Sequence, residues 1–150
     1  MQVLYALESQ MLKTFLSGGA KILEDWKIKI AVLWLLWECG GIVQLMLYSF
    51  QPGVMERINA GELIWDQTTP ELLLVFAIIF LIPLVMAFLS LTLKDSINRW
   101  ANIIVGIVWL GLGFIDVPRL ISNPAAYAIL LWLTEVVAKV LIVWYAWKSK

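Results

Sequence analysis

Long runs of apolar residues alternate along this chain with short polar stretches. Four runs approach the roughly 20 residues that a helix needs to cross a hydrocarbon core of about 30 Å, at a rise of about 1.5 Å per residue. They cover residues 28–50, 71–93, 100–117 and 125–147. Strands that face lipid would alternate apolar and polar positions, which these runs do not. The pattern therefore predicts four transmembrane helices.

Polar stretches rich in turn-forming residues separate the four runs. They are Gln51-Pro52-Gly53, Lys94-Asp95-Ser96 and Ser122-Asn123-Pro124. Because short connections place consecutive helices side by side and antiparallel, the predicted fold is an all-α, antiparallel four-helix bundle. Pro83 falls near the middle of the second run, where it removes a backbone hydrogen bond and predicts a bend that shapes helix packing.

The first 26 residues form a separate predicted segment, followed by a transmembrane domain at residues 27–150. Within the segment, apolar residues recur near helical spacing between polar ones, and Gly18-Gly19 follows them. This pattern predicts an amphipathic helix. Such a helix lies flat on a membrane surface or packs against a helix of a partner protein.

Basic residues are unevenly distributed between the two predicted sides of the membrane. One side carries Lys13, Lys21, Lys27, Lys29, Lys94, Arg99, Lys148 and Lys150. The opposite side carries only Arg57 and Arg119. Because Lys and Arg are enriched in cytoplasmic loops, we expect a multi-pass protein of the cell membrane with both termini in the cytoplasm.

Composition supports a membrane protein and excludes several kinds of chemistry. Of the 150 residues, 62% are hydrophobic and 15% charged, and the formal net charge is zero, which gives no sign of a nucleic-acid partner. The chain has no histidine and one cysteine, so intrachain disulfides, His-based metal sites and His-based triads are excluded. No motif of a known enzyme class occurs. We predict no catalytic residue, metal or cofactor, and an enzyme is the least favoured class.

Three ionisable residues fall deep inside the predicted spans, where charge is costly and usually functional. From the cytoplasmic ends of their helices, Glu38 lies about 15 Å deep, Glu135 about 18 Å and Lys139 about 12 Å, at the helical rise. The two carboxylates therefore share a level. Lys139 follows Glu135 by four residues and projects from the same helix face. These three residues are the predicted proton- or ion-binding candidates.

Two interpretations of these charges remain open. Lys139 could neutralise either carboxylate and leave the other to exchange protons, which would form a relay. Alternatively, a Glu135–Lys139 pair with a neutral Glu38 fixes helix register or an oligomer contact. Secondary polar candidates are Asp116 and Arg119, expected to pair near the outer end, and Gln44 between the two levels.

Three stretches of the sequence, 21–28 (KILEDWKI), 98–104 (NRWANII) and 135–147 (EVV and LIVWYAW), carry a resemblance. They resemble an uncharacterised family of small bacterial and archaeal membrane proteins. The resemblance covers most of residues 21–150 and implies a prokaryotic four-helix protein without a known activity. Glu38-Cys39-Gly40-Gly41 gives a looser likeness to small multidrug-resistance antiporters, which also have four short spans and a glutamate on the first. Glu135 and Lys139 set this chain apart, so no substrate is implied.

Two function classes follow from the sequence. The first is a small oligomeric transporter or channel in which Glu38 binds a proton or cation, with symmetric assembly supplying the rest of the pore wall. The second is a non-catalytic accessory or scaffold subunit of a membrane complex. The expected partners are the lipid bilayer and either a second copy of the chain or another membrane protein.

Overall fold

Four long helices account for most of the computed structural model, which describes residues 25–63, 66–122 and 124–149. They are α2 (Asp25–Ser49), α4 (Pro70–Thr92), α5 (Asp95–Gly113) and α7 (Ala126–Lys148). The predicted N-terminal amphipathic segment lies outside the described residues, except for Asp25 and Trp26, which already belong to α2.

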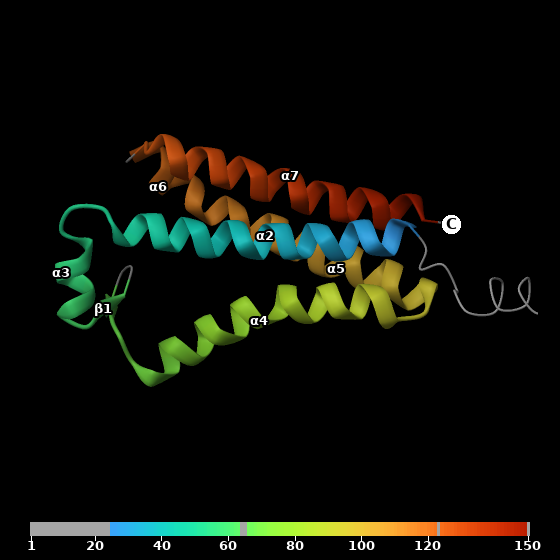
Figure 1. Ribbon diagram of the computed structural model, residues 1–150, viewed down its shortest axis with the longest axis horizontal. Coiled ribbons are helices and arrows are strands. Elements are labelled where there is room, and N and C mark those ends of the chain that lie inside the picture. Colours follow the sequence, from blue (N-terminus) through green and yellow to red (C-terminus); the bar gives the residue numbers. More distant parts are fainter. Residues whose placement is uncertain (1–24, 64–65, 123, 150) are drawn as a thin grey trace, which may run out of the picture.

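The four helices form the predicted all-α bundle (Figure 1). Each long helix runs antiparallel to the one that precedes it along the chain, and α2 packs against both α4 and α7. On its other side α7 packs against α5. All four helical segments are long and apolar enough to cross a membrane, which confirms that this is a membrane protein.

The third membrane-spanning segment extends further at both ends than the sequence predicts. α5 begins at Asp95 and continues through a 3₁₀ turn, η1 (Phe114–Asp116), into α6 (Val117–Ser122). Asp95 and Ser96, expected in a loop, form the first turn of α5. An acidic residue stabilises a helix N-terminus, and here Asp95 also forms an ion pair with Lys27 of α2. The apolar pattern hides this start because polar residues occupy the early turns of α5.

The connection between α2 and α4 contains short ordered elements in place of a simple loop. A helix, α3 (Val54–Asn59), precedes the two-residue strands β1 (Glu62–Leu63) and β2 (Asp66–Gln67), which pair antiparallel. Gly53 and Gly61 flank α3 with φ of 79° and 81°, backbone conformations that glycine adopts without steric cost.

α4 carries both a clear start signal and an internal proline. The hydroxyl of Thr69 accepts a hydrogen bond from the Leu72 amide at 3.2 Å, and Pro70 occupies the first turn. Pro83 is buried inside the helix, and α4 changes direction along its length in Figure 1. Every fully buried residue of α4 lies at Pro83 or beyond, and the side chains of its first half are exposed or only half-buried.

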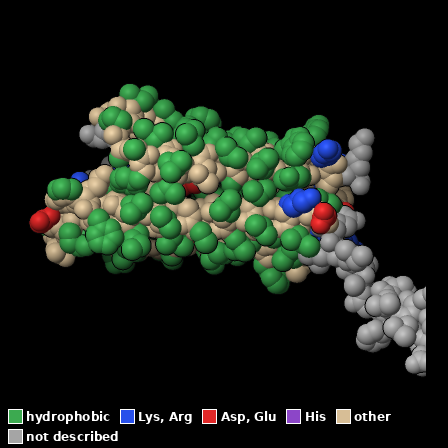
Figure 2. Space-filling view, turned by 45° about the horizontal axis from the view of Figure 1, so that its top comes forward, with side chains coloured by type: hydrophobic (Ala, Val, Ile, Leu, Met, Phe, Trp, Pro, Cys, Tyr) green, Lys and Arg blue, Asp and Glu red, His purple; other side chains and the backbone are tan. Residues whose placement is uncertain are grey.

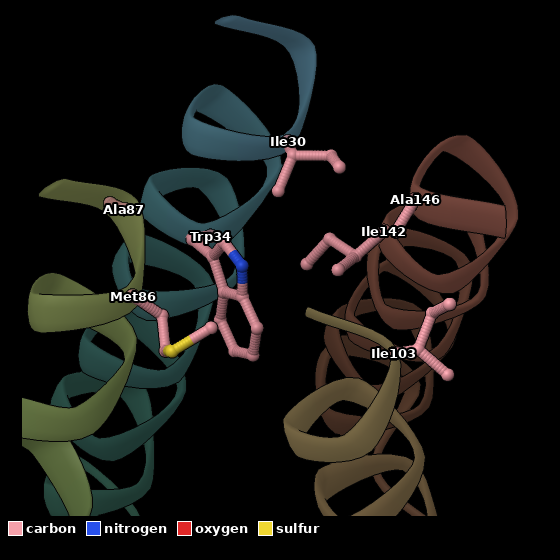
Figure 3. Close-up of a cluster of buried hydrophobic side chains, with 7 residues drawn as sticks. All are labelled: Ile30, Trp34, Met86, Ala87, Ile103, Ile142 and Ala146. Carbon is pink, nitrogen blue, oxygen red and sulfur yellow. The ribbon is translucent and has the colours of Figure 1, made fainter. Parts of the chain in front are cut away.

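The hydrophobic core lies nearer the end of the bundle where α2 begins. Its buried members come from all four long helices (Figure 3): Ile30, Trp34, Met86, Ala87, Ile103, Ile142 and Ala146. Trp34 is the largest fully buried side chain, and the end of the Met86 side chain points toward its indole ring. Outside this core, apolar side chains cover most of the face shown in Figure 2, as a surface in contact with lipid requires.

Candidate functional site

The predicted pair of Glu135 and Lys139 exists and is held by further contacts. Lys139 Nζ lies 3.3 Å from Glu135 Oε2, and the same oxygen accepts a hydrogen bond from the indole nitrogen of Trp37 at 3.0 Å. The ammonium also lies 4.5 Å from the centre of the Trp37 ring, a cation–π contact. Trp37 on α2 thus contacts both members of an ion pair on α7.

Lys139 fits closely against the end of α5 and has little freedom to move. Only 3% of the residue is exposed. A Cβ atom at Gly113 would lie 3.2 Å from Nζ, and the backbone oxygen of Gly113 accepts a hydrogen bond from the Trp132 indole at 2.9 Å. Asp116, one turn later, adds a favourable electrostatic interaction with the ammonium. Contacts with Glu135 and the Trp37 ring therefore fix the position of the Lys139 ammonium.

Glu38 lies beside this pair without joining it. The residue is 6% exposed, and within the described part of the chain no hydrogen bond or ion pair reaches its carboxylate. Glu135 is its electrostatic neighbour, and Gly40 and Gly41 of α2 also lie against the Glu135 side chain. The two carboxylates thus lie close together within the bundle, but the Lys139 ammonium forms its ion pair with Glu135 alone.

The Glu38 carboxylate is buried but not sealed. Among the described side chains, the one fully enclosed polar atom without a partner is Nε of Arg99, so each Glu38 oxygen keeps some accessible surface. We call Glu38, Glu135, Lys139 and Trp37 the charged cluster. It holds two carboxylates and one ammonium, so one further cation would complete its neutralisation.

The secondary candidates contribute less than the sequence suggests. Asp116 and Arg119 form no ion pair with each other among the described residues. Instead, the Arg119 guanidinium lies 4.5 Å from the centre of the Tyr48 ring, while Asp116 acts on Lys139. Gln44 is half-buried and makes no hydrogen bond in the described structure. The expected shallow pair is wrong because the Arg119 side chain lies against Tyr48 of α2 while Asp116 interacts with Lys139 of α7.

A second buried polar group was not predicted as a unit. Asn102 Oδ1 accepts hydrogen bonds from the Trp34 indole at 2.7 Å and from Ser90 Oγ at 3.1 Å. Its amide nitrogen donates to Asn98, whose own amide donates to the Ser90 carbonyl at 2.7 Å. We call Trp34, Ser90, Asn98 and Asn102 the amide cluster. All four residues are fully buried, and they join α2, α4 and α5.

The sequence did contain a signal for the amide cluster. Asn98, Asn102 and Gly106 recur every four residues and so share one face of α5. A Cβ atom at Gly106 would lie 2.8 Å from Val143 Cγ2, so this glycine permits the close approach of α5 to α7. The described residues hold no group of three or more His, Cys, Asp or Glu side chains that could bind a metal.

The family can be assigned by comparison with known sequences. The model of the Family of unknown function DUF6326 matches residues 20–150. The chain belongs to this family. The match covers all four long helices of the DUF6326 chain and both polar clusters. Comparisons of the same chain with curated proteins and with solved structures give no match.

Proposed function

We propose that this protein is a small transporter or channel that binds a proton or a monovalent cation at Glu38. The observation that supports the proposal is a carboxylate at mid-length of a membrane-spanning bundle that is 6% exposed and has no partner in the described structure. A permanently charged carboxylate in that position costs several kcal/mol, and a bound proton or cation removes the cost. Glu38 therefore has a physical reason to bind and release a positive charge.

The neighbouring ion pair supports this role by fixing the local field. Lys139 is held by Glu135, by the Trp37 ring and by the field of Asp116, so it cannot serve as a mobile counter-ion for Glu38. Glu135 disfavours a second negative charge beside it. In the proposed function, the pair sets the affinity of Glu38 for its cation.

The rest of the proposal concerns assembly and placement. One four-helix unit offers little interior for a pore, so we propose a homo-oligomer in the cell membrane with both termini in the cytoplasm. The first half of α4 is the surface we assign to the second copy, because none of its side chains is fully buried against this chain's own helices. Beyond Glu71 its exposed residues are apolar, as a helix contact in lipid requires.

Proton flux in proteoliposomes tests the proposal. Vesicles that contain a luminal pH dye receive a Na⁺ or K⁺ gradient, and the membrane potential is clamped. We expect the native protein to produce flux above that of protein-free vesicles, and Glu38→Gln to abolish it. The matched control is Glu56→Gln, the same change at an exposed glutamate of α3. Flux that is equal in the native protein and in both Glu38→Gln and Glu135→Gln would contradict the proposal.

A second candidate is an accessory subunit of a membrane complex. It is favoured by the same half of α4, in which no side chain is fully buried and which a helix of another protein could cover. Co-purification from native membranes distinguishes the two. A stable second protein, cross-linked through cysteines introduced at Leu74 and Leu81 on α4, would support an accessory role. A homo-oligomer cross-linked at these positions would support the transporter.

A further inference from the structure

Three cations lie over three aromatic rings at the end of α7. Lys148 is 5.1 Å from the centre of the Trp144 ring, Arg99 of α5 is 5.7 Å from that of Trp147, and Lys29 of α2 is 5.8 Å from that of Tyr145. Each cation comes from a different helix. Trp144 and Tyr145 also contact each other, with ring centres 5.0 Å apart. Trp147 follows Trp144 by three residues and is its neighbour on the helix surface, so the three pairs adjoin one another along the end of α7.

Helical geometry places this surface on the outside of the bundle. The buried stripe of α7 runs through Ala138, Ile142 and Ala146. Trp144 and Trp147 lie on the opposite side of the helix and are 48% and 62% exposed. Since α7 packs between α2 and α5, Lys29 and Arg99 approach the exposed face of α7 from its two flanks. Arg99 and Lys148 thus lie over the two rings of the exposed face of α7, and Lys29 lies over Tyr145 at the flank that faces α2.

Two of these cations lack an acidic partner in the described structure. Lys29 pairs with Asp25 at 3.2 Å, whereas no carboxylate reaches Arg99 or Lys148. Nε of Arg99 is fully enclosed and has no hydrogen-bond acceptor, while its terminal nitrogens stay accessible. A guanidinium that lies over an indole ring and presents free donors suits a phosphate oxygen.

We propose that this surface binds the headgroup of an anionic phospholipid. Its phosphate would lie between Arg99 and Lys148, over the edges of Trp144 and Trp147. Indole rings favour the headgroup level of a bilayer. Further along the same face of α7 lie the exposed apolar residues Val137 and Val140, against which acyl chains would pack. The combination of a phosphate-binding head and an apolar track fits a lipid and not a soluble anion.

Native mass spectrometry of the delipidated full chain tests the site. The probes are phosphatidylglycerol and phosphatidylcholine of the same chain length, added separately at equal concentration. We expect phosphatidylglycerol to bind more tightly, and Arg99→Gln and Lys148→Gln each to weaken its binding about fivefold. Arg99→Lys, which keeps the charge and loses the fork of donors, should lie between Arg99→Gln and the native protein.

Lys94→Gln is the matched control, because Lys94 is an exposed cation at the same end of the bundle with no ring contact in the described structure. It should leave phosphatidylglycerol binding unchanged. Equal binding of the two lipids, or equal losses in Lys94→Gln and Arg99→Gln, would overturn the proposal. Displacement of the lipid by millimolar glycerol phosphate would also overturn it, since the surface would then be a site for a soluble anion.

Discussion

The amide cluster and the charged cluster are neighbours with opposite characters. Their tryptophans, Trp34 and Trp37, contact each other with ring centres 5.3 Å apart. Yet every polar side-chain atom of the amide cluster that is fully enclosed has a hydrogen-bond partner, whereas the charged cluster contains a carboxylate with none. Burial alone therefore does not mark a functional residue in a membrane helix. The state of hydrogen bonding and charge compensation separates a structural polar group from a candidate site.

Removal of the lysine should have the largest effect on stability. Lys139→Met leaves Glu135 as a second uncompensated carboxylate, so we expect a loss of about 3 kcal/mol in the free energy of unfolding. Reversible unfolding in mixed micelles measures it. The double variant Lys139→Met with Glu135→Gln should recover most of the loss, because Gln still accepts the Trp37 hydrogen bond. If the double variant is no more stable than the single one, the charged cluster is not an electrostatic unit.

Disruption of the amide cluster should be next in size and should leave function intact. Asn102→Leu deprives the Trp34 indole and the Asn98 carbonyls of their partners, at a cost of about 2 kcal/mol. Proton flux per folded molecule should equal that of the native protein. Loss of flux in correctly folded Asn102→Leu would contradict the division into a structural cluster and a functional one.

Close packing behind the amide cluster should contribute less. Gly106→Ala places a Cβ atom 2.8 Å from Val143 Cγ2 and forces α5 away from α7, with an expected loss of about 1.5 kcal/mol. The matched control is Gly111→Ala on the same helix, where nothing lies within 4 Å of the added atom. Thermal unfolding in detergent should show a lower midpoint for the first variant alone. Equal midpoints would mean that α5 and α7 can move apart without a loss of stability.

The smallest effect should come from an identical change made in both clusters. Replacement of Trp34 or Trp37 by benzothienylalanine, an isostere of tryptophan with sulfur in place of the indole N–H, removes one hydrogen-bond donor and leaves no cavity. We expect about 0.6 kcal/mol for Trp34, whose acceptor also receives a hydrogen bond from Ser90. We expect about twice that for Trp37, because its acceptor is a carboxylate. Unfolding of both variants under the same conditions measures the ratio, and a larger loss for Trp34 would reverse the comparison.

The fold could be predicted from sequence because a membrane span is a local property. Length and apolarity alone define the four helices. The start of α5 was misplaced because polar residues at Asp95, Ser96 and Asn98 interrupt the apolar pattern. Only tertiary partners make the Asn98 amide compatible with burial. The elements α3, β1 and β2 depend on turn geometry that carries a weak signal over so few residues. A prokaryotic source stays a prediction.

The candidate site could be predicted in its depth but not in its pairing. Helical rise places Glu38 and Glu135 at one level, and the four-residue spacing brings Lys139 to Glu135. That Glu38 remains unpaired depends on how α2 is rotated against α7. The contribution of Trp37 and of Gly113 to the lysine site depends on the same packing. Sequence periodicity does not contain this information.

Infrared difference spectroscopy of the reconstituted protein during a change of bulk pH tests the central claim, that Glu38 exchanges a positive charge with the surroundings. Exposed carboxylates such as Glu56 and Glu71 contribute pH-dependent bands to every spectrum, so the signal of Glu38 is the component that differs between the native protein and Glu38→Gln. We expect Glu38→Gln to lose one pH-responsive carboxyl component that Glu135→Gln and Glu56→Gln both retain. Identical pH difference spectra of the native protein and Glu38→Gln would contradict the claim.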